Sequence, residues 1–184
     1  ALQENGPDEF YRGSIAARIC ADMDAHGGLL TAADFASHTA DWVEPITVRY
    51  RGRTAFNLPP NTQGMASLEI LNILENFDVA ALGEGTAAYY HLLVEATKEA
   101  FADRDRWLTD PAFLDIPLKF LLSPEHGRNQ AARISMEKAA QHVQPMDPAG
   151  DTIWLGVVDR KGCAVSLLQS IYHDFGSAIV PGDT

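Results

Sequence analysis

The stretch GDTIWLGVVDRKGCAVSLLQSIYHDFG, residues 150–176, is the most informative part of the sequence about the fold. The rest of the chain is interpreted around it. Two apolar runs flank the polar segment DRKGC, and its glycine, Gly162, suits a three-residue hairpin loop because glycine readily adopts a left-handed backbone. With the loop at residues 160–162, an unbroken ladder places Thr152 opposite Ser170. Directly opposite residues project to the same face, with Cβ atoms about 4.5–5.5 Å apart. The pattern therefore predicts two hydroxyl groups at the open end of a β-hairpin.

Both faces of this hairpin are apolar. Ile153, Leu155 and Val157 alternate on one side, and Trp154 and Val158 lie on the other. Strands that are apolar on both faces are typical of a sheet that other layers cover on each side, so the sequence predicts a buried hairpin. The same register adds two pairs, Leu155 with Leu167 and Val157 with Val165.

Thr152 begins the first strand, and a threonine is a weak nucleophile unless a base lies beside it. Cleavage of the chain before Thr152 would create an α-amino group next to the hydroxyl. This amine, with a reference pKa of about 7.7–8.0, would accept the hydroxyl proton. The alternative is that Thr152 merely starts a strand, and spacing alone favours that simpler interpretation.

Several segments in one order resemble the γ-glutamyltranspeptidase family. The hairpin stretch resembles the start of the family's small subunit, where a precursor cleaves itself before a threonine that becomes the N-terminal nucleophile. The segments that resemble the large subunit are EFYRGSIAARI at residues 9–19, GGLLTAADFASH at 27–38, YRGRTAFNLPPNTQGMASLEILNILENFD at 50–78 and EATKEAFADRDRWLTDP at 95–111. Because several motifs in order are more specific than any single one, the chain is identified as a member of this family.

The order of helices and hairpins by itself predicts an α/β (α+β) layered domain. The resemblance narrows this to part of the four-layer αββα sandwich of N-terminal-nucleophile hydrolases. It also implies that residues 1–151 are the C-terminal part of the large-subunit region and residues 152–184 the N-terminal part of the small-subunit region. Together they would form one incomplete domain, with the remainder of both subunits as its partners.

The resemblance further implies self-cleavage between Asp151 and Thr152, followed by transfer of a γ-glutamyl group from glutathione or a related amide to water or an amine. Ser170 matches the family's hydroxyl beside the nucleophile. Tyr172 stands where typical members carry an asparagine that helps to hold the donor's α-amino group, although it could instead pack against Phe175. No cofactor and no metal are implied.

Two alternatives stay open at this point. One is a cephalosporin-acylase-like amidohydrolase of the same superfamily, which takes a glutaryl-type side chain, and the other is a non-catalytic homologue or fragment. The oxyanion donors and the arginine that binds the α-carboxylate are expected outside residues 1–184, so this piece alone is expected to be inactive, since losing a single oxyanion donor typically costs about 10²–10³ in rate.

The amino-acid composition restricts the classes of partner that the chain is expected to bind. The formal net charge of −11, from 14 basic and 25 acidic residues, argues against nucleic acid or an anionic membrane as a partner. Cys20 and Cys163 provide no disulfide framework of the secreted type. No apolar run approaches the length of a membrane span, and the sequence assigns no cellular location.

Spacing and capping signals predict the remaining elements. Helices are expected over residues 9–26, 32–38, 65–77, 87–108 and 123–140, and a second hairpin from Pro45 to Asn57 with a tight turn at Arg51-Gly52. Thr31 and Thr86 are the expected N-caps of the second and fourth helices. The loop from Pro59 to Gly64 is expected to be structural, with lining of the substrate cleft as the less favoured alternative.

Two groups of charged or titratable residues do not predict a binding site. In the run Asp103-Arg104-Asp105-Arg106, residues two apart do not face one another on a helix, and the arginines are expected to pair with acids three or four residues away. The histidines lack metal-ligand spacing; they are His26, His38, His91, His126, His142 and His173.

Overall fold

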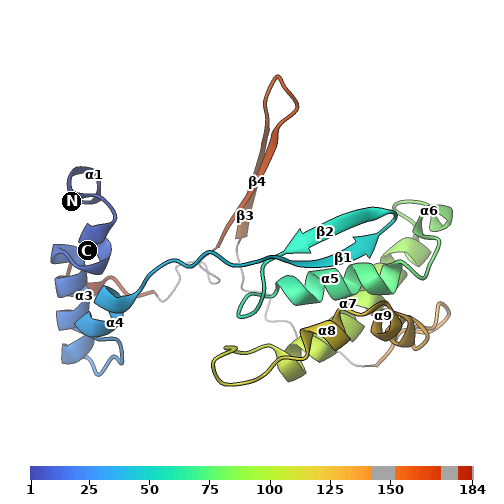
Figure 1. Cartoon of the computed structure of the whole chain (residues 1–184), viewed down its shortest axis with the longest axis horizontal. Coiled ribbons are helices and arrows are strands. Elements are labelled where there is room, and N and C mark those ends of the chain that lie inside the picture. The colour runs from blue at the N-terminus through green and yellow to red at the C-terminus, as the bar shows by residue number, and fades with distance from the viewer. Residues whose placement is uncertain (142–151, 171–177, 184) are drawn as a thin grey trace. The chain divides into compact units, whose positions relative to one another are not determined.

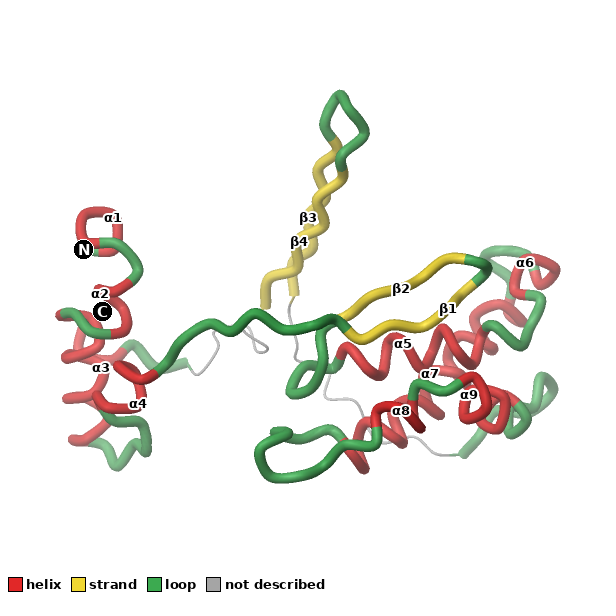
Figure 2. The backbone as a smooth tube through the Cα atoms, viewed as in Figure 1, coloured by secondary structure: helices red, strands yellow, loops and turns green. Residues whose placement is uncertain are grey.

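The computed structural model describes residues 1–141, 152–170 and 178–183, and the chain divides into two compact units. One unit comprises Ala1–Asp41 together with Pro145–Thr184, and the other comprises Trp42–Gln144 (Figures 1 and 2). Each unit is described by itself.

The unit Trp42–Gln144 is built around one helix, α5. Its elements are β1 (Ile46–Tyr50), β2 (Arg53–Asn57), α5 (Gly64–Leu74), α6 (Val79–Leu82), α7 (Ala87–Trp107), α8 (Leu118–Leu121) and α9 (Pro124–Ala131). The antiparallel β1–β2 hairpin contacts α5, and α5 also contacts α7 and α9 (Figure 1). A helix in this central position must bury most of its surface, and 8 of the 11 residues of α5 are buried.

The predicted hairpin with its turn at Arg51-Gly52 is confirmed. Arg51 and Gly52 have φ angles of 49° and 76°, the left-handed pair that suits the right-handed twist of two adjoining strands. The carboxylate of Glu75, just beyond α5, accepts a hydrogen bond of 2.9 Å from the Arg51 backbone N–H. This contact joins the turn to the end of the helix.

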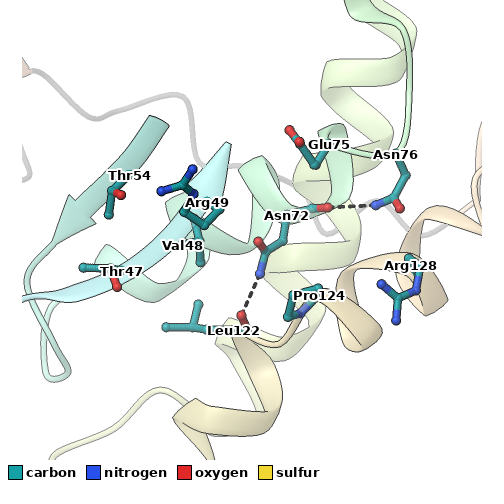
Figure 3. A pocket seen from close by; sticks show the side chains of 10 residues that line it. All are labelled: Thr47, Val48, Arg49, Thr54, Asn72, Glu75, Asn76, Leu122, Pro124 and Arg128. Atoms are coloured by element: carbon teal, nitrogen blue, oxygen red, sulfur yellow. Dashed lines mark hydrogen bonds between the residues drawn. The ribbon is translucent and has the colours of Figure 1, made fainter. Parts of the chain in front are cut away.

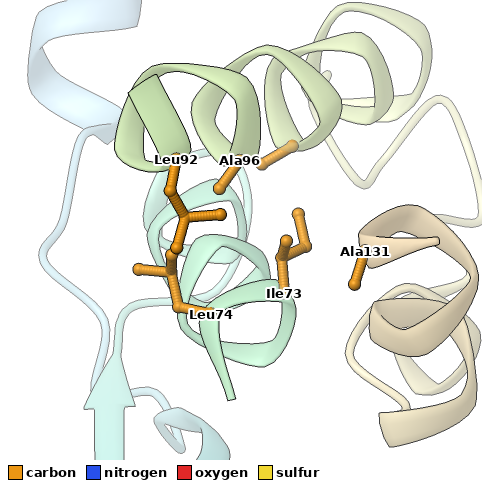
Figure 4. Packing of buried hydrophobic residues seen from close by; sticks show 6 residues of the cluster. Ile73, Leu74, Leu92, Ala96 and Ala131 are labelled. Carbon is orange, nitrogen blue, oxygen red and sulfur yellow. The ribbon is translucent and has the colours of Figure 1, made fainter. Parts of the chain in front are cut away.

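The core of this unit lies where α5, α7 and α9 meet (Figure 4). Ile73 and Leu74 from α5 pack against Leu92 and Ala96 from α7, with Ala131 from α9 beside them. The small alanine side chains let the helix backbones approach closely. Thr86 caps α7 as expected, because its side chain accepts a hydrogen bond from the Tyr89 N–H.

Helix α9 is shorter than predicted. It begins after the N-cap Ser123 but ends at Ala131, whereas the sequence suggested residue 140. The segment that follows is held against α7 instead: the Ser135 carbonyl oxygen lies 2.7 Å from the His91 ring, and the Ala140 N–H donates to Glu95 over 3.1 Å. These contacts replace the next helical turns.

In its described residues the other unit contains four helices, a hairpin and a 3-10 turn. They are α1 (Leu2–Asn5), α2 (Asp8–Tyr11), α3 (Ser14–Ala25), α4 (Ala32–Ser37), β3 (Thr152–Val158), β4 (Ala164–Ser170) and the 3-10 turn η1 (Pro181–Asp183), which contacts α3. Helix α4 has the predicted capping box between Thr31 and Asp34. Within the part of the chain that the structure describes, no helix is long and apolar enough to cross a lipid bilayer.

The single helix predicted over residues 9–26 is wrong, because the chain breaks between α2 and α3. The Glu9 carboxylate accepts a 2.8 Å hydrogen bond from the Ser14 backbone N–H and another from its hydroxyl, so it satisfies the start of α3. Gly13 lies so close that a Cβ there would stand 2.5 Å from a Glu9 oxygen. Apolar spacing alone cannot reveal such a break.

Candidate active site

The hairpin β3–β4 has the predicted register. Thr152 lies opposite Ser170, Leu155 opposite Leu167 and Val157 opposite Val165. Since opposite residues of an antiparallel pair share a face, Thr152 and Ser170 share one face at the open end.

The turn of the hairpin fixes this register. Gly162 has a φ of 80°, and its N–H donates to the Asp159 carbonyl over 3.0 Å. The Asp159 carboxylate accepts from the backbone N–H groups of Lys161 and Cys163 at 2.8 and 2.9 Å. Because the turn sets the register, a different loop length would move Thr152 away from Ser170.

Sequence reasoning missed an anchored aromatic residue on the same face. Trp154, two residues beyond Thr152, donates from its indole N–H to the Ser166 hydroxyl over 2.7 Å. A Cβ on Gly156 would stand 2.8 Å from two indole carbons, so the ring lies over this glycine. The available signal was the glycine at a same-face position within an otherwise apolar strand.

The hairpin is not buried within this chain, so that prediction is wrong. Ile153, Trp154 and Val158 are 62%, 62% and 70% exposed, and every described residue of β4 is exposed. Among the described residues β3 and β4 pair only with each other, so no further strand extends this sheet. The residues thus have the composition of a buried sheet but not its surroundings.

Two of the predicted site residues cannot be compared with the structure. Asp151, before the proposed cleavage bond, and Tyr172, two residues beyond Ser170, lie outside the described residues. Their roles stay predictions.

The unit Trp42–Gln144 holds a pocket of about 360 Å³ between β1, β2, α5 and α9 (Figure 3). It is lined by Thr47, Val48, Arg49, Thr54, Asn72, Glu75, Asn76, Leu122, Pro124 and Arg128. The Asn72 side chain donates to the Leu122 carbonyl over 2.9 Å and so ties α5 to the chain before α9. No serine, threonine or cysteine among these lining residues is paired with a base, so the pocket does not contain an activated nucleophile.

A second pocket of about 490 Å³ is lined by Pro59 and Pro60, the segment 111–116 and Leu118. Asn61, Thr62 and Gln63 do not line it. The Thr62 hydroxyl instead donates to the Leu58 and Pro59 carbonyl oxygens, and Gln63 accepts from Arg104. These contacts fit the structural role predicted for the loop.

The charged run on α7 makes contacts that the spacing did not predict. Arg104 pairs with its neighbour Asp105 at 2.7 Å rather than with an acid three or four residues away. Asp103 pairs with His126 of α9 over 2.6 Å. In the described ranges no group of three or more His, Cys, Asp or Glu residues is arranged to hold a metal ion.

Comparison with solved structures places this geometry in the N-terminal-nucleophile hydrolase fold, as a mixed α/β chain that covers part of it. The cephalosporin acylase from Bacillus halodurans superposes with a TM-score of 0.79 at 37% identity, over 98% of this chain and 33% of that one. The γ-glutamyltranspeptidase from Helicobacter pylori gives 0.69 at 30% identity, over 76% of this chain and 40% of that one. The chain belongs to the γ-glutamyltranspeptidase family, whose sequence pattern matches residues 1–184.

Curated relatives support the same assignment. The glutathione hydrolase-like YwrD proenzyme of Bacillus subtilis is 42% identical over 183 residues, which are 100% of this chain and 34% of the relative. The oxamate amidohydrolase proenzyme of Klebsiella pneumoniae is 43% identical with the same coverage, and the glutathione hydrolase proenzyme of Escherichia coli is 37% identical over 100% of this chain and 33% of its own length. The chain thus spans about a third of these relatives.

Proposed function

We propose that the complete protein carrying this chain is a self-cleaving γ-glutamyltransferase or amidohydrolase with Thr152 as its N-terminal nucleophile. The observation that carries the proposal is the register of β3–β4, which pairs Thr152 with Ser170 at the open end. The match to proenzymes adds that relatives of this chain are made as precursors. In this proposal residues 1–151 end the large subunit and residues 152–184 begin the small one.

Cleavage follows from the chemistry of a hydroxyl beside its own backbone. The Thr152 hydroxyl attacks the Asp151 carbonyl, the C–N bond breaks as an ester forms, and the nitrogen takes the proton. The Thr152 α-amino group is free once the C–N bond has broken, and water then hydrolyses the ester, which frees the Thr152 hydroxyl and leaves a carboxylate on Asp151. The amine becomes the base that activates the hydroxyl.

Turnover repeats the same step on a substrate amide. The Thr152 oxygen attacks the side-chain carbonyl of a γ-glutamyl or related amide, the amine leaves with a proton from the α-ammonium group, and an ester links the acyl group to Thr152. Water or a second amine then takes the acyl group. This chemistry requires no cofactor, and the Ser170 hydroxyl would stabilise the nucleophile oxygen.

The proposal also accounts for the exposed hairpin. In the four-layer αββα sandwich, the two apolar faces of β3–β4 would be covered by segments from the other two-thirds of the protein, which would also supply the oxyanion donors. A lone two-stranded hairpin is marginal in water, so these strands need such partners.

A second candidate is an amidohydrolase for acyl groups without an α-amino group. Tyr172 favours it, because a phenol is larger than an asparagine amide and a weaker acceptor for an ammonium group. The similarity to an oxamate amidohydrolase and a cephalosporin acylase supports it as well.

The two candidates are separated by kcat/KM values for matched γ-glutamyl and glutaryl anilides, with oxamate as a third substrate, measured on the complete protein. Thr152→Ala should abolish turnover of every substrate, and retained turnover would remove Thr152 as the nucleophile. Tyr172→Asn should shift preference towards γ-glutamyl donors. A strong γ-glutamyl preference that Tyr172→Asn leaves unchanged would remove Tyr172 from the specificity of the enzyme, and a complete protein inactive on all three would favour a non-catalytic homologue.

A further inference from the structure

A buried polar cluster joins the three main helices of the unit Trp42–Gln144, away from the proposed nucleophile in sequence. It consists of Glu69 on α5, Asp103 on α7, and His126 and Gln130 on α9, and we call it the Glu69 cluster. Glu69 is 0% exposed and Gln130 1% exposed. The proposed acyl transfer uses none of these residues.

Asp103 already has two donors. The His126 ring nitrogen Nε2 lies 2.6 Å from Asp103 Oδ2, and Gln130 Nε2 donates to the same oxygen over 2.9 Å. The second amide hydrogen of Gln130 reaches the Glu99 carbonyl at 3.3 Å. Both hydrogens of this amide are therefore used, and its oxygen Oε1 can only accept.

Glu69 lacks the partners that a buried carboxylate requires. Neither of its oxygens has a hydrogen-bond partner in the described part of the molecule, and Gln130 Oε1 has none either. Three buried acceptors thus stand without a donor, and leaving such groups unsatisfied is costly. A proton on one Glu69 oxygen turns that acceptor into a donor for Gln130 Oε1, which satisfies two of the three groups and leaves one Glu69 oxygen without a donor.

The electrostatic surroundings of Glu69 also favour its protonated, neutral form. The pKa of Glu69 is raised to about 8: burial is the largest cause, the negative charge of Asp103 adds to it, and the nearby Gln130 amide offsets part of the increase. Glu95 on α7 shows the contrast: it is also buried, but Lys98 Nζ donates to it over 2.7 Å and the Ala140 N–H over 3.1 Å. These contacts outweigh burial, and the pKa of Glu95 is lowered.

No described cation compensates a charge on Glu69. From α7 the carboxylate of Asp103 faces it, and Glu99 is paired with Arg133 at 3.1 Å. From α9 the imidazole of His126 is committed to Asp103. The remaining basic side chains on the elements that pack against α5 are Arg49, Arg51 and Arg53 of the β1–β2 hairpin, His91, Lys98, Arg104 and Arg106 of α7, and Arg128 of α9. Among the described residues none of these side chains forms a hydrogen bond or an ion pair with Glu69, and its charged neighbour is the acid Asp103.

We propose that Glu69 is a neutral acid at neutral pH, that it donates its proton to Gln130 Oε1, and that losing this proton in mildly alkaline solution loosens α5 from α9. The Glu69 cluster is then a pH-sensitive latch in the region before the proposed cleavage bond. It does not depend on the proposed function.

The direction of the pH effect follows from linkage. The pKa of Glu69 rises from 4.5 in the unfolded chain to about 8 in the fold, so the folded state binds the proton more tightly. Stability from this group is complete below about pH 4.5, decreases as the pH rises, and is lost above about pH 8.

The test compares unfolding midpoints of the complete protein with those of Glu69→Gln and of Glu125→Gln, an exposed acid on α9. Glu69→Gln keeps the shape of the protonated acid and can donate to Gln130 Oε1. It should be as stable as the parent near pH 5 and more stable above about pH 8, so the difference between the two midpoints should grow as the pH rises. Glu125→Gln should follow the parent.

Infrared spectroscopy of the unsubstituted protein tests the proposal without relying on a variant that folds. The carbonyl band of a protonated carboxylic acid should be present at pH 7 and disappear by about pH 9, while Glu69→Gln lacks it. The proposal is overturned if no such band is present at pH 7, or if Glu69→Gln keeps the pH dependence of the parent. Stability that rises with pH and falls on chelation would equally contradict it, since Glu69 would then be an ionised cation ligand.

Discussion

Ser170 is the residue whose predicted role depends most directly on the hairpin register, because its position opposite Thr152 follows from one turn length. Its hydroxyl is expected to stabilise the nucleophile oxygen in both cleavage and turnover. Replacing it by alanine should remove about one neutral hydrogen bond. The activation barrier of both steps should rise by about 0.5–1.5 kcal/mol, which slows each step roughly three- to tenfold.

The rates of precursor cleavage and of single-turnover acyl transfer in Ser170→Ala provide the measurement. Ser166→Ala is a matched control, because Ser166 lies on the same strand and face but holds Trp154 instead. Equal rates in Ser170→Ala and the parent would show that the hydroxyl has no role in the chemistry. A larger effect from Ser166→Ala would move the critical contact to Trp154.

Single residues also show what the sequence could and could not predict. The turn at Gly162 was predictable because loop chemistry is local and requires a left-handed glycine. The Glu69 cluster was not, because its members come from three helices and meet only in the fold. The one signal was Glu69 itself, an acid between Leu68 and Ile70 and the only charged residue of α5.

Among the elements, helix starts were predicted better than helix ends. Thr31, Thr86 and Ser123 each cap a helix at the expected place, since an N-cap is a local hydrogen bond. The break at Gly13 and the early end of α9 depend on contacts with Glu9 and α7, which apolar periodicity does not encode. The hairpin β3–β4 was right in register and wrong in burial for the same reason, because burial requires other segments.

Gly64 tests how closely α5 approaches the loop before it. A Cβ at this position would stand 2.2 Å from the Leu58 carbonyl oxygen, a backbone atom that cannot move aside freely. Gly64→Ala should therefore destabilise the protein by about 1–3 kcal/mol, although alanine is the better helix former by about 1 kcal/mol. Denaturant unfolding measures the change, and a variant as stable as the parent would show that the loop yields without cost.

At the scale of the whole molecule, the chain spans about a third of its relatives, and its hairpin exposes the apolar residues of a buried sheet. The fold class was predictable from the order of elements, and the family from motifs in sequence order. The position of the hairpin in a layered sandwich was not, because covering layers and oxyanion donors are properties of the complete protein.

Self-cleavage is the property on which the proposed chemistry depends, since only a free α-amino group at Thr152 provides the base. The most direct measurement is intact mass combined with N-terminal sequencing of the complete purified protein. The proposed chemistry predicts two chains, the second beginning at Thr152, and a single uncut chain for Thr152→Ala. An uncut parent protein that turns over substrate, or a Thr152→Ala protein cut at the same bond, would contradict it.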